Sequence, residues 1–244
     1  MNQVGALARI ATIPLSLIAG CALIASATGG DPTFAFELAA GTLIVAWLVH
    51  LGRHACPALA AAAQLSAQSR RARVAGAEVQ LLDITRPVAF VSGLLRPRIY
   101  LSPPLMALLD ARELRGVVLH EQHHRRTLAP LRGLALESWL RLLGWLPPAR
   151  RSLAARLAAL ECEADAAAIA RGVQPAALAS ALLKWEAYLP AAASAFTAAA
   201  EVRIRELVAW SGSERPVRPL SVPVEWAAPA GALIALWACH LIGA

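Results

Sequence analysis

The run His120-Glu121-Gln122-His123-His124 constrains the fold of this chain more than any other stretch. It fits the pattern H-E-x-x-H, with the two outer histidines four residues apart. In a helix, side chains at this spacing lie one turn above each other on one face, so His120 and His124 can point at one zinc ion. Glu121 is then placed to take a proton from a water at the metal. The pattern therefore predicts a helix here and a third metal ligand elsewhere.

A second stretch supplies that ligand and argues against the plainer alternative, in which residues 123–126 are only the polar end of a solvated helix. Residues 151–171 are rich in alanine and leucine and predict a helix that carries Glu161 and Asp165 four positions apart. We expect Glu161 to bind the metal and Asp165 to orient a ligand histidine from behind. Cys162 is a weaker alternative ligand, because it lies about 100° round the helix from Glu161.

The composition predicts a membrane protein. Hydrophobic residues make up 58% of the chain and the mean hydropathy is +0.54, more apolar than ordinary soluble domains. Residues 10–28, 34–51 and 226–244 are each long and apolar enough to span a bilayer. The loop at 29–33 has no lysine or arginine, whereas arginines follow residue 51, so the positive-inside rule places the next region in the cytoplasm. We expect a multi-pass protein of the inner cell membrane. Its net charge of +7 is then explained by arginines that flank the membrane spans.

These patterns predict three parts. Residues 1–52 form two transmembrane helices, residues 53–222 a cytoplasmic domain, and residues 223–244 a C-terminal transmembrane helix. Segment 128–147 is apolar, but a single crossing there would put Glu161 and His124 on opposite sides of the membrane. We expect it to be interfacial, re-entrant or packed on the domain.

Within the cytoplasmic part, residues 53–76 predict a helix and residues 78–84, 87–92 and 98–101 three strands of a small sheet. A capping box at 110–113 predicts the start of the motif helix, and Pro130 its end. Further helices are expected at 175–188 and 198–210. The last carries Arg203 and Arg205, which fit a solvated face or, less often, contact with a substrate.

Three features recur together in one known group of proteins. They are the run Gly-Leu-Leu-Arg-Pro-Arg-Ile-Tyr-Leu-Ser-Pro at 93–103, the motif helix at 113–126, and the E-x-x-x-D pair of Glu161 and Asp165. Over about residues 79–171 the chain resembles the membrane-embedded gluzincin metallopeptidases. The nearest resemblance is to the beta-lactam sensor-transducers of the BlaR/MecR antirepressor type.

The resemblance implies a mainly α membrane protein with a cytoplasmic α+β gluzincin zinc-peptidase domain and a small β-sheet. It implies one zinc ion at His120, His124 and Glu161, with Glu121 as general base and Asp165 as support. The implied reaction is hydrolysis of a peptide bond in a cytoplasmic or membrane-associated protein, typically a BlaI/MecI-type transcriptional repressor in signal transduction. A regulatory membrane partner or a homodimer fits the same scheme. The donor that stabilises the oxyanion stays open among His123, Tyr100, Tyr188 and Arg203.

Two departures and two alternatives accompany the resemblance. The sensor-transducers have four spans and a large extracellular drug-binding domain, whereas this chain shows three spans and stops at Ala244, so we do not expect direct beta-lactam sensing. CAAX-protease and heat-shock membrane peptidases share both motifs but insert a membrane hairpin between them, for which there is no room here. A catalytically silent membrane signalling scaffold is the alternative from another class. Direct nucleic-acid binding is not expected, because no aromatic-basic motif is present.

Overall fold

The computed structural model describes residues 32–188 and 203–210 of the chain. The described residues fall into two compact units. Unit 1 comprises residues 32–54 and 134–153, and unit 2 comprises residues 55–133, 154–188 and 203–210. The spans predicted at 10–28 and 226–244 lie outside the described residues, as do the linker before the last span and the start of the helix predicted at 198–210. The described chain is mainly α-helical with one small sheet, as expected.

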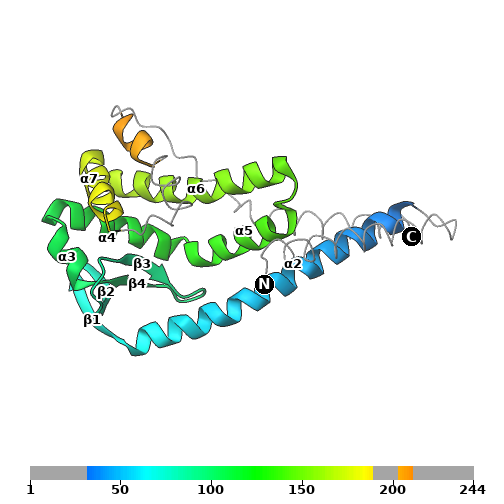
Figure 1. Cartoon of the computed structure of the whole chain (residues 1–244), viewed down its shortest axis with the longest axis horizontal. Coiled ribbons are helices and arrows are strands. Elements are labelled where there is room, and N and C mark those ends of the chain that lie inside the picture. Colours follow the sequence, from blue (N-terminus) through cyan, green and yellow to red (C-terminus); the bar gives the residue numbers. More distant parts are fainter. Residues whose placement is uncertain (1–31, 189–202, 211–244) are drawn as a thin grey trace. The chain divides into compact units, whose positions relative to one another are not determined.

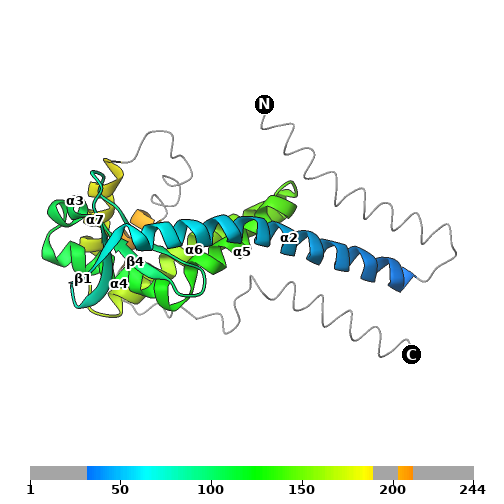
Figure 2. The same cartoon turned by 90° about the horizontal axis from the view of Figure 1, so that it is seen from below.

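The helix α2 (Pro32–Ala67) is 36 residues long, and Figures 1 and 2 both draw it as continuous through Pro57. Its section Gly41–Ala67 is the one helix of the described chain that is long and apolar enough to cross a membrane. This agrees with a span near the N-terminus, and the multi-pass topology stays a prediction. The helix predicted at 53–76 is correct only as far as Ala67, because the chain then enters a strand.

In unit 1, one side of α2 packs against the helix α5 (Ala129–Leu143). The rings of Trp47 and Trp139 stack with centroids 5.3 Å apart, and the Trp47 indole N–H donates to the Ala135 carbonyl oxygen at 3.3 Å. Val45 and Leu48, on the other side of α2, are more than half exposed. A helix that buries one apolar side and exposes another fits an apolar environment. How segment 128–147 relates to a membrane stays a prediction.

Unit 2 contains a four-stranded mixed sheet in the order β1-β2-β4-β3. Its strands are β1 (Ser69–Val74), β2 (Ala77–Leu82), β3 (Ala89–Ser92) and β4 (Arg98–Leu101). The β1–β2 and β3–β4 pairs are antiparallel, and β2 and β4 are parallel. The three predicted strands are confirmed.

The prediction of a helix as far as residue 76 is wrong for β1, which is a strand. Its sequence is basic and directly follows an alanine-rich helix, which hides the strand signal. The signal is alternation: Ala72 and Val74 contribute to the core, whereas Arg71 and Arg73 are exposed. Ala75 and Gly76 close the hairpin with φ angles of 47° and 81°, the positive values that a tight two-residue hairpin turn requires.

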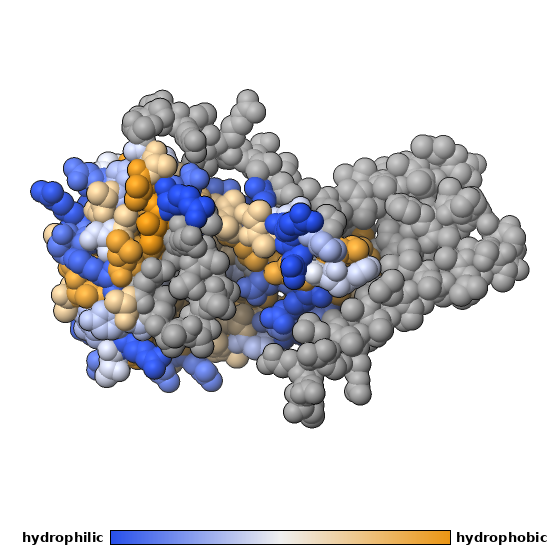
Figure 3. Space-filling model, turned by 45° about the horizontal axis from the view of Figure 1, so that its top comes forward, coloured by the Kyte–Doolittle hydropathy of each residue, from blue (hydrophilic) through white to orange (hydrophobic). Residues whose placement is uncertain are grey.

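The main core of unit 2 lies between the sheet and three helices, α3 (Pro103–Leu108), α4 (Ala111–Arg126) and α7 (Pro175–Glu186). Val79, Leu101 and Val118 are almost fully buried in it. Gly116 permits the close packing of α4, because a Cβ there would lie 3.1 Å from side-chain atoms of Val173 and Leu178. Outside this core, hydrophobic and hydrophilic residues lie side by side on the face that Figure 3 shows.

The helix α6 (Pro147–Ile169) contains the predicted segment with Glu161, and Gly172, with a φ of 81°, caps it. The Gly172 N–H donates to the Ile169 carbonyl and the Val173 N–H to the Ala168 carbonyl, which together form a Schellman motif. The predicted end of α4 at Pro130 is wrong. The helix ends at Arg126, and Pro130 is the second residue of α5, where its missing N–H leaves no hydrogen bond unmade.

Candidate metal centre

The motif histidines lie on α4, whose start is fixed by the predicted capping box. The Asp110 carboxylate accepts hydrogen bonds from the N–H groups of Arg112 and Glu113, both at 2.8 Å. The Glu113 carboxylate accepts the Asp110 N–H at 2.8 Å in return. From there the helix runs for 16 residues through the whole motif, so His120 and His124 share one face.

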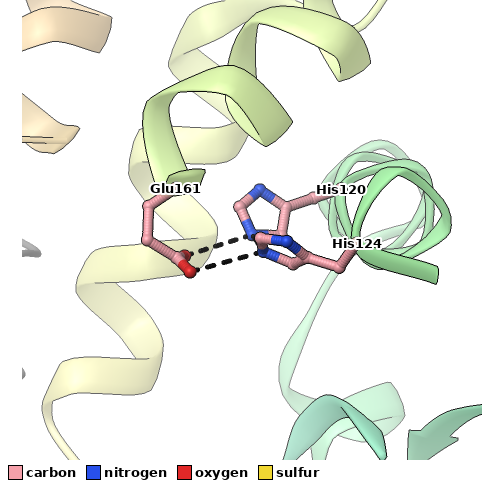
Figure 4. Close-up of side chains that lie close together, drawn as sticks. All are labelled: His120, His124 and Glu161. Carbon is pink, nitrogen blue, oxygen red and sulfur yellow. Dashed lines mark hydrogen bonds and ion pairs between the residues drawn. The ribbon is translucent and has the colours of Figure 1, made fainter. Parts of the chain in front are cut away.

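Both histidines point at a carboxylate from α6, which is the predicted third ligand (Figure 4). Nε2 of His120 lies 3.4 Å from one Glu161 oxygen, and Nε2 of His124 lies 3.4 Å from the other. The two Nε2 atoms are 2.9 Å apart. One ligand atom from each residue thus lies within 4.8 Å of the others. The three residues form a group that could hold a metal ion.

The donor set fits zinc. Two imidazole nitrogens and one carboxylate are the ligands of many catalytic zinc sites, which leave the fourth position open. A tetrahedral ion with bonds of about 2.1 Å separates its ligand atoms by about 3.4 Å, and both Glu161–histidine distances match this value. The two histidine nitrogens lie closer together, at 2.9 Å, which is a hydrogen-bond distance.

Asp165, the residue expected to orient a ligand histidine, lies against the far side of the His120 ring. Its Oδ1 lies 2.8 Å from His120 Nδ1. Burial raises the pKa of Asp165, but hydrogen bonds from His120 and Arg203 outweigh burial and hold it below its usual value, so Asp165 is a carboxylate that accepts. His120 Nδ1 therefore carries a proton toward Asp165, and Nε2 of the same ring faces Glu161.

His120 and Glu161 shift each other's pKa strongly. Burial lowers the pKa of His120, but its bonds to Asp165 and Glu161 outweigh burial and raise that pKa to about 9. For Glu161, burial again acts upward, and the hydrogen bonds from His120 and His124 lower its pKa well below the usual range. A metal ion that binds here must displace the proton on the histidines.

Arg203, one of the four candidates left open for stabilising the oxyanion, lies beside the group and binds the carboxylates of Asp165 and Glu161. Its Nε and Nη2 atoms donate to the two Asp165 oxygens, both at 2.8 Å, and its Nη1 lies 3.3 Å from a Glu161 oxygen. The side chain is only 11% exposed, so the expectation of a solvated face is wrong for Arg203. Arg205, two residues later, is exposed. No local pattern distinguishes the two arginines, because the partners of Arg203 lie about forty positions earlier in the chain.

The two ligand histidines differ in how they are held. Asp165 and Arg203 fix the ring of His120, whereas His124 Nδ1 is buried without a hydrogen-bond partner in the part of the chain that the structure describes. Ligand histidines usually donate their second N–H to an oxygen that orients the ring. Within the described chain, the His124 ring is held by its contacts with Glu161 and His120.

Glu121, the predicted general base, is 6% exposed and lies next to the first ligand on α4. Its carboxylate makes no hydrogen bond or ion pair within residues 32–188 and 203–210. Burial is the main influence on its pKa, which is raised despite the opposing charges of His120 and His124. A raised pKa brings a carboxylate nearer to the neutral range in which a general base works best.

The remaining candidates lie outside this group. Cys162 is half-buried, and burial raises the pKa of its thiol. His123 is half-buried, and burial together with the charges of His124 and His120 lowers its pKa to about 4. Tyr100 is buried in the sheet against Phe90, and Tyr188 lies exposed after α7. The residue that stabilises the oxyanion stays a prediction.

Comparisons of the chain with protein-family models, with curated proteins and with solved structures find no match. The family resemblance therefore depends on the motif residues alone, and the geometry of His120, His124 and Glu161 is the observation that bears on function.

Proposed function

We propose that this protein is a membrane-anchored zinc endopeptidase. One observation carries the proposal: a histidine pair from an H-E-x-x-H helix and a glutamate from a second helix, 37 positions further along the chain, converge so that one ligand atom of each residue lies within 4.8 Å of the others. Apolar packing alone does not explain why the histidine pair and Glu161 face each other. Burial of unpaired ionisable groups is costly, so such clusters tend to mark functional sites.

Each residue of the centre has a distinct part in this proposal. His120, His124 and Glu161 would hold the ion, which when bound supplies a Lewis acid that polarises a peptide carbonyl and makes a water more acidic. Glu121 takes the proton of the attacking water and delivers it to the leaving amine, so that one carboxylate serves both halves of the reaction. Asp165 keeps the proton of His120 on Nδ1, and Arg203 keeps Asp165 ionised and oriented.

The substrate in this proposal is a cytoplasmic or membrane-associated protein. The resemblance to the BlaR/MecR antirepressor peptidases favours a BlaI/MecI-type repressor, and α2 offers a segment that could anchor the catalytic unit at a membrane. The proposal includes the inner-membrane, multi-pass topology with the centre facing the cytoplasm, as the arginine distribution predicts.

The test compares detergent-purified wild-type protein with Glu121→Gln. Zinc content is measured for both, and proteolysis is followed on a BlaI/MecI-type repressor and on the protein itself. Glutamine is nearly isosteric with glutamate but cannot accept the proton, so zinc should stay at about one ion per chain while cleavage falls by about a thousandfold.

Each result separates the candidate functions. Cleavage by the wild type alone establishes the peptidase. Tight binding of a repressor without cleavage, in a protein that holds zinc, favours the signalling scaffold. A wild-type protein that binds no zinc would contradict the proposal that this protein is a zinc enzyme.

A further inference from the structure

The strongest unassigned feature of unit 2 is a hollow of about 550 Å³ formed by the β1–β2 hairpin, α4 and the turn after α6. One glutamate, Glu78, lines it, together with the buried amide of Gln122. Its other charged residues are all arginines: Arg73, Arg115, Arg125, Arg126 and Arg171. We call it the arginine hollow.

The arginine hollow lies on the side of α4 away from the candidate metal centre. Arg115, Gln122 and Arg126 follow each other at helical spacing, and Gln122 is about 200° round the helix from His120. None of the residues that line the hollow is His120, His124 or Glu161. The hollow is therefore a separate feature.

Its positive charge is uncompensated. None of the five arginines forms an ion pair with an acidic residue within residues 32–188 and 203–210. By contrast, Arg132 and Arg203 of the same unit are paired with carboxylates. Like charges gathered round one hollow repel each other, and an anionic ligand would remove this repulsion.

Part of the hollow is held in shape. Arg171 donates to the Gln122 side-chain oxygen at 2.8 Å, and Arg115 donates to the Arg171 carbonyl at 3.2 Å. These bonds tie the turn after α6 to α4 and leave donors of both guanidinium groups unused. Each guanidinium has five N–H donors in a planar fork that matches a carboxylate.

The positive surface continues beyond the hollow, which indicates an extended ligand. A second hollow of about 480 Å³ shares Arg73, Glu78 and Arg125 with the first and adds Arg71 and Arg98. A single small anion would need only one of the two hollows. A chain that presents several negative charges in a row could contact both.

We propose that the arginine hollow and its extension bind an acidic, Asp- and Glu-rich segment of a protein partner. Among the residues that the structure describes, no aromatic side chain lines either hollow, so these residues offer no stacking platform of the kind that single-stranded nucleic acid uses. None of the exposed large hydrophobic residues of the described chain lines them, although surfaces that lie on membranes usually combine basic with apolar side chains. The carboxylates of an extended peptide could pair with the arginines of both hollows without aromatic or apolar contacts.

The test measures binding of a short fluorescent peptide rich in Asp and Glu to the full-length protein in detergent. A peptide of equal length rich in Asn and Gln is the ligand control. The protein carries Glu121→Gln to prevent cleavage, so peptidase activity does not enter the result. The proposal can thus fail while the proposed function holds, and the reverse.

Three paired variants locate the binding. Arg73→Gln with Arg126→Gln should weaken binding of the acidic peptide by about a hundredfold, because each of the two lost charged hydrogen bonds costs about 1.5 kcal/mol. Arg73→Glu with Arg126→Glu should weaken it by about a thousandfold, because the new carboxylates also repel the peptide. Arg96→Glu with Arg112→Glu changes the net charge equally at exposed positions outside both hollows and should have little effect. The glutamine pair keeps the test valid if charge reversal disturbs folding.

Several outcomes would overturn the proposal. Equal losses in the hollow and control pairs would show that the attraction is diffuse. Binding of inorganic phosphate, single-stranded DNA or vesicles containing anionic lipid in place of the acidic peptide, with the same dependence on Arg73 and Arg126, would assign the hollow to that ligand instead.

Discussion

The two sides of α4 use charge in opposite ways. On one side, His120 and His124 face carboxylates that are themselves hydrogen-bonded, and an arginine from a distant segment completes the network. On the other side, Arg115 and Arg126 have no acidic partner in the described chain and line an open hollow. Charge that is buried and paired fixes the geometry of donor atoms, whereas charge that is exposed and unpaired is available to a ligand from outside. One helix thus carries a buried, paired group on one side and exposed arginines without acidic partners in the described chain on the other.

The sharpest test of this contrast removes one ligand. His124→Ala deletes a nitrogen of the group of three, so zinc content should fall from about one ion per chain to nearly none. His123→Ala is the matched control, since His123 is adjacent but is not one of the three residues, and its variant should keep the metal. Metal analysis of the purified proteins decides the matter. Equal zinc loss in both variants would mean that the group was misassigned.

Removing the support behind the ligands should have a smaller effect. Arg203→Ala leaves Asp165 without its two guanidinium bonds, and we expect zinc affinity to fall by about ten- to a hundredfold. Arg203→Lys should recover part of the loss, because it restores the charge without the planar fork. Competition with a fluorescent zinc chelator gives the affinities. Arg205→Ala provides the control, and an equally large loss there would contradict a specific role for Arg203.

The metal-facing side of α4 also carries a buried charge near its start. Glu113 is 4% exposed and accepts hydrogen bonds from Ser180 at 2.6 Å and from Lys184 at 2.7 Å, both on α7. Burial raises the pKa of Glu113, but the bonds from Lys184, Ser180 and the Asp110 N–H outweigh it and lower that pKa. Glu113→Gln should therefore cost about 2 kcal/mol of unfolding free energy at neutral pH.

The same lowered pKa gives a pH dependence with a definite sign. The stabilisation is complete above the unfolded pKa of about 4.3 and is lost as the pH falls through the lower folded pKa. Thermal unfolding at pH 7 and pH 4 should show the gap between wild type and Glu113→Gln shrinking in acid. Other carboxylates, including Glu161 and Asp165, contribute equally to both proteins. A gap that stayed constant with pH would refute the ionic role of Glu113.

The smallest expected effect is that of a change in the arginine hollow on zinc affinity at the other side of α4. Arg126→Gln alters the arginine hollow but touches none of the metal-centre residues, so zinc affinity should change by less than about twofold. The chelator competition used for Arg203 measures this change. A large loss of zinc affinity would show that the two sides of α4 are coupled and would break the comparison.

The sequence by itself determined much of the centre. The four-residue spacing of His120 and His124 follows from helix geometry, and the capping box that starts their helix is local. Glu161 and Asp165 were found in the same way, as a second pair at helical spacing. The Gly172 cap and three of the four strands are likewise encoded within a few neighbouring residues. Patterns of this kind can be recognised in the sequence because the residues that interact are only a few positions apart.

Only the tertiary structure decided the rest. β1 looks helical from its neighbours, and it becomes a strand because pairing with β2 satisfies its backbone and places Ala72 and Val74 in the core. Arg203 and Arg205 are equivalent in sequence, yet only Arg203 reaches Asp165. The arginine hollow likewise joins positions from Arg73 to Arg171 that no short window contains. Each of these features depends on contacts between distant segments, and their free energy arises only when the chain has folded.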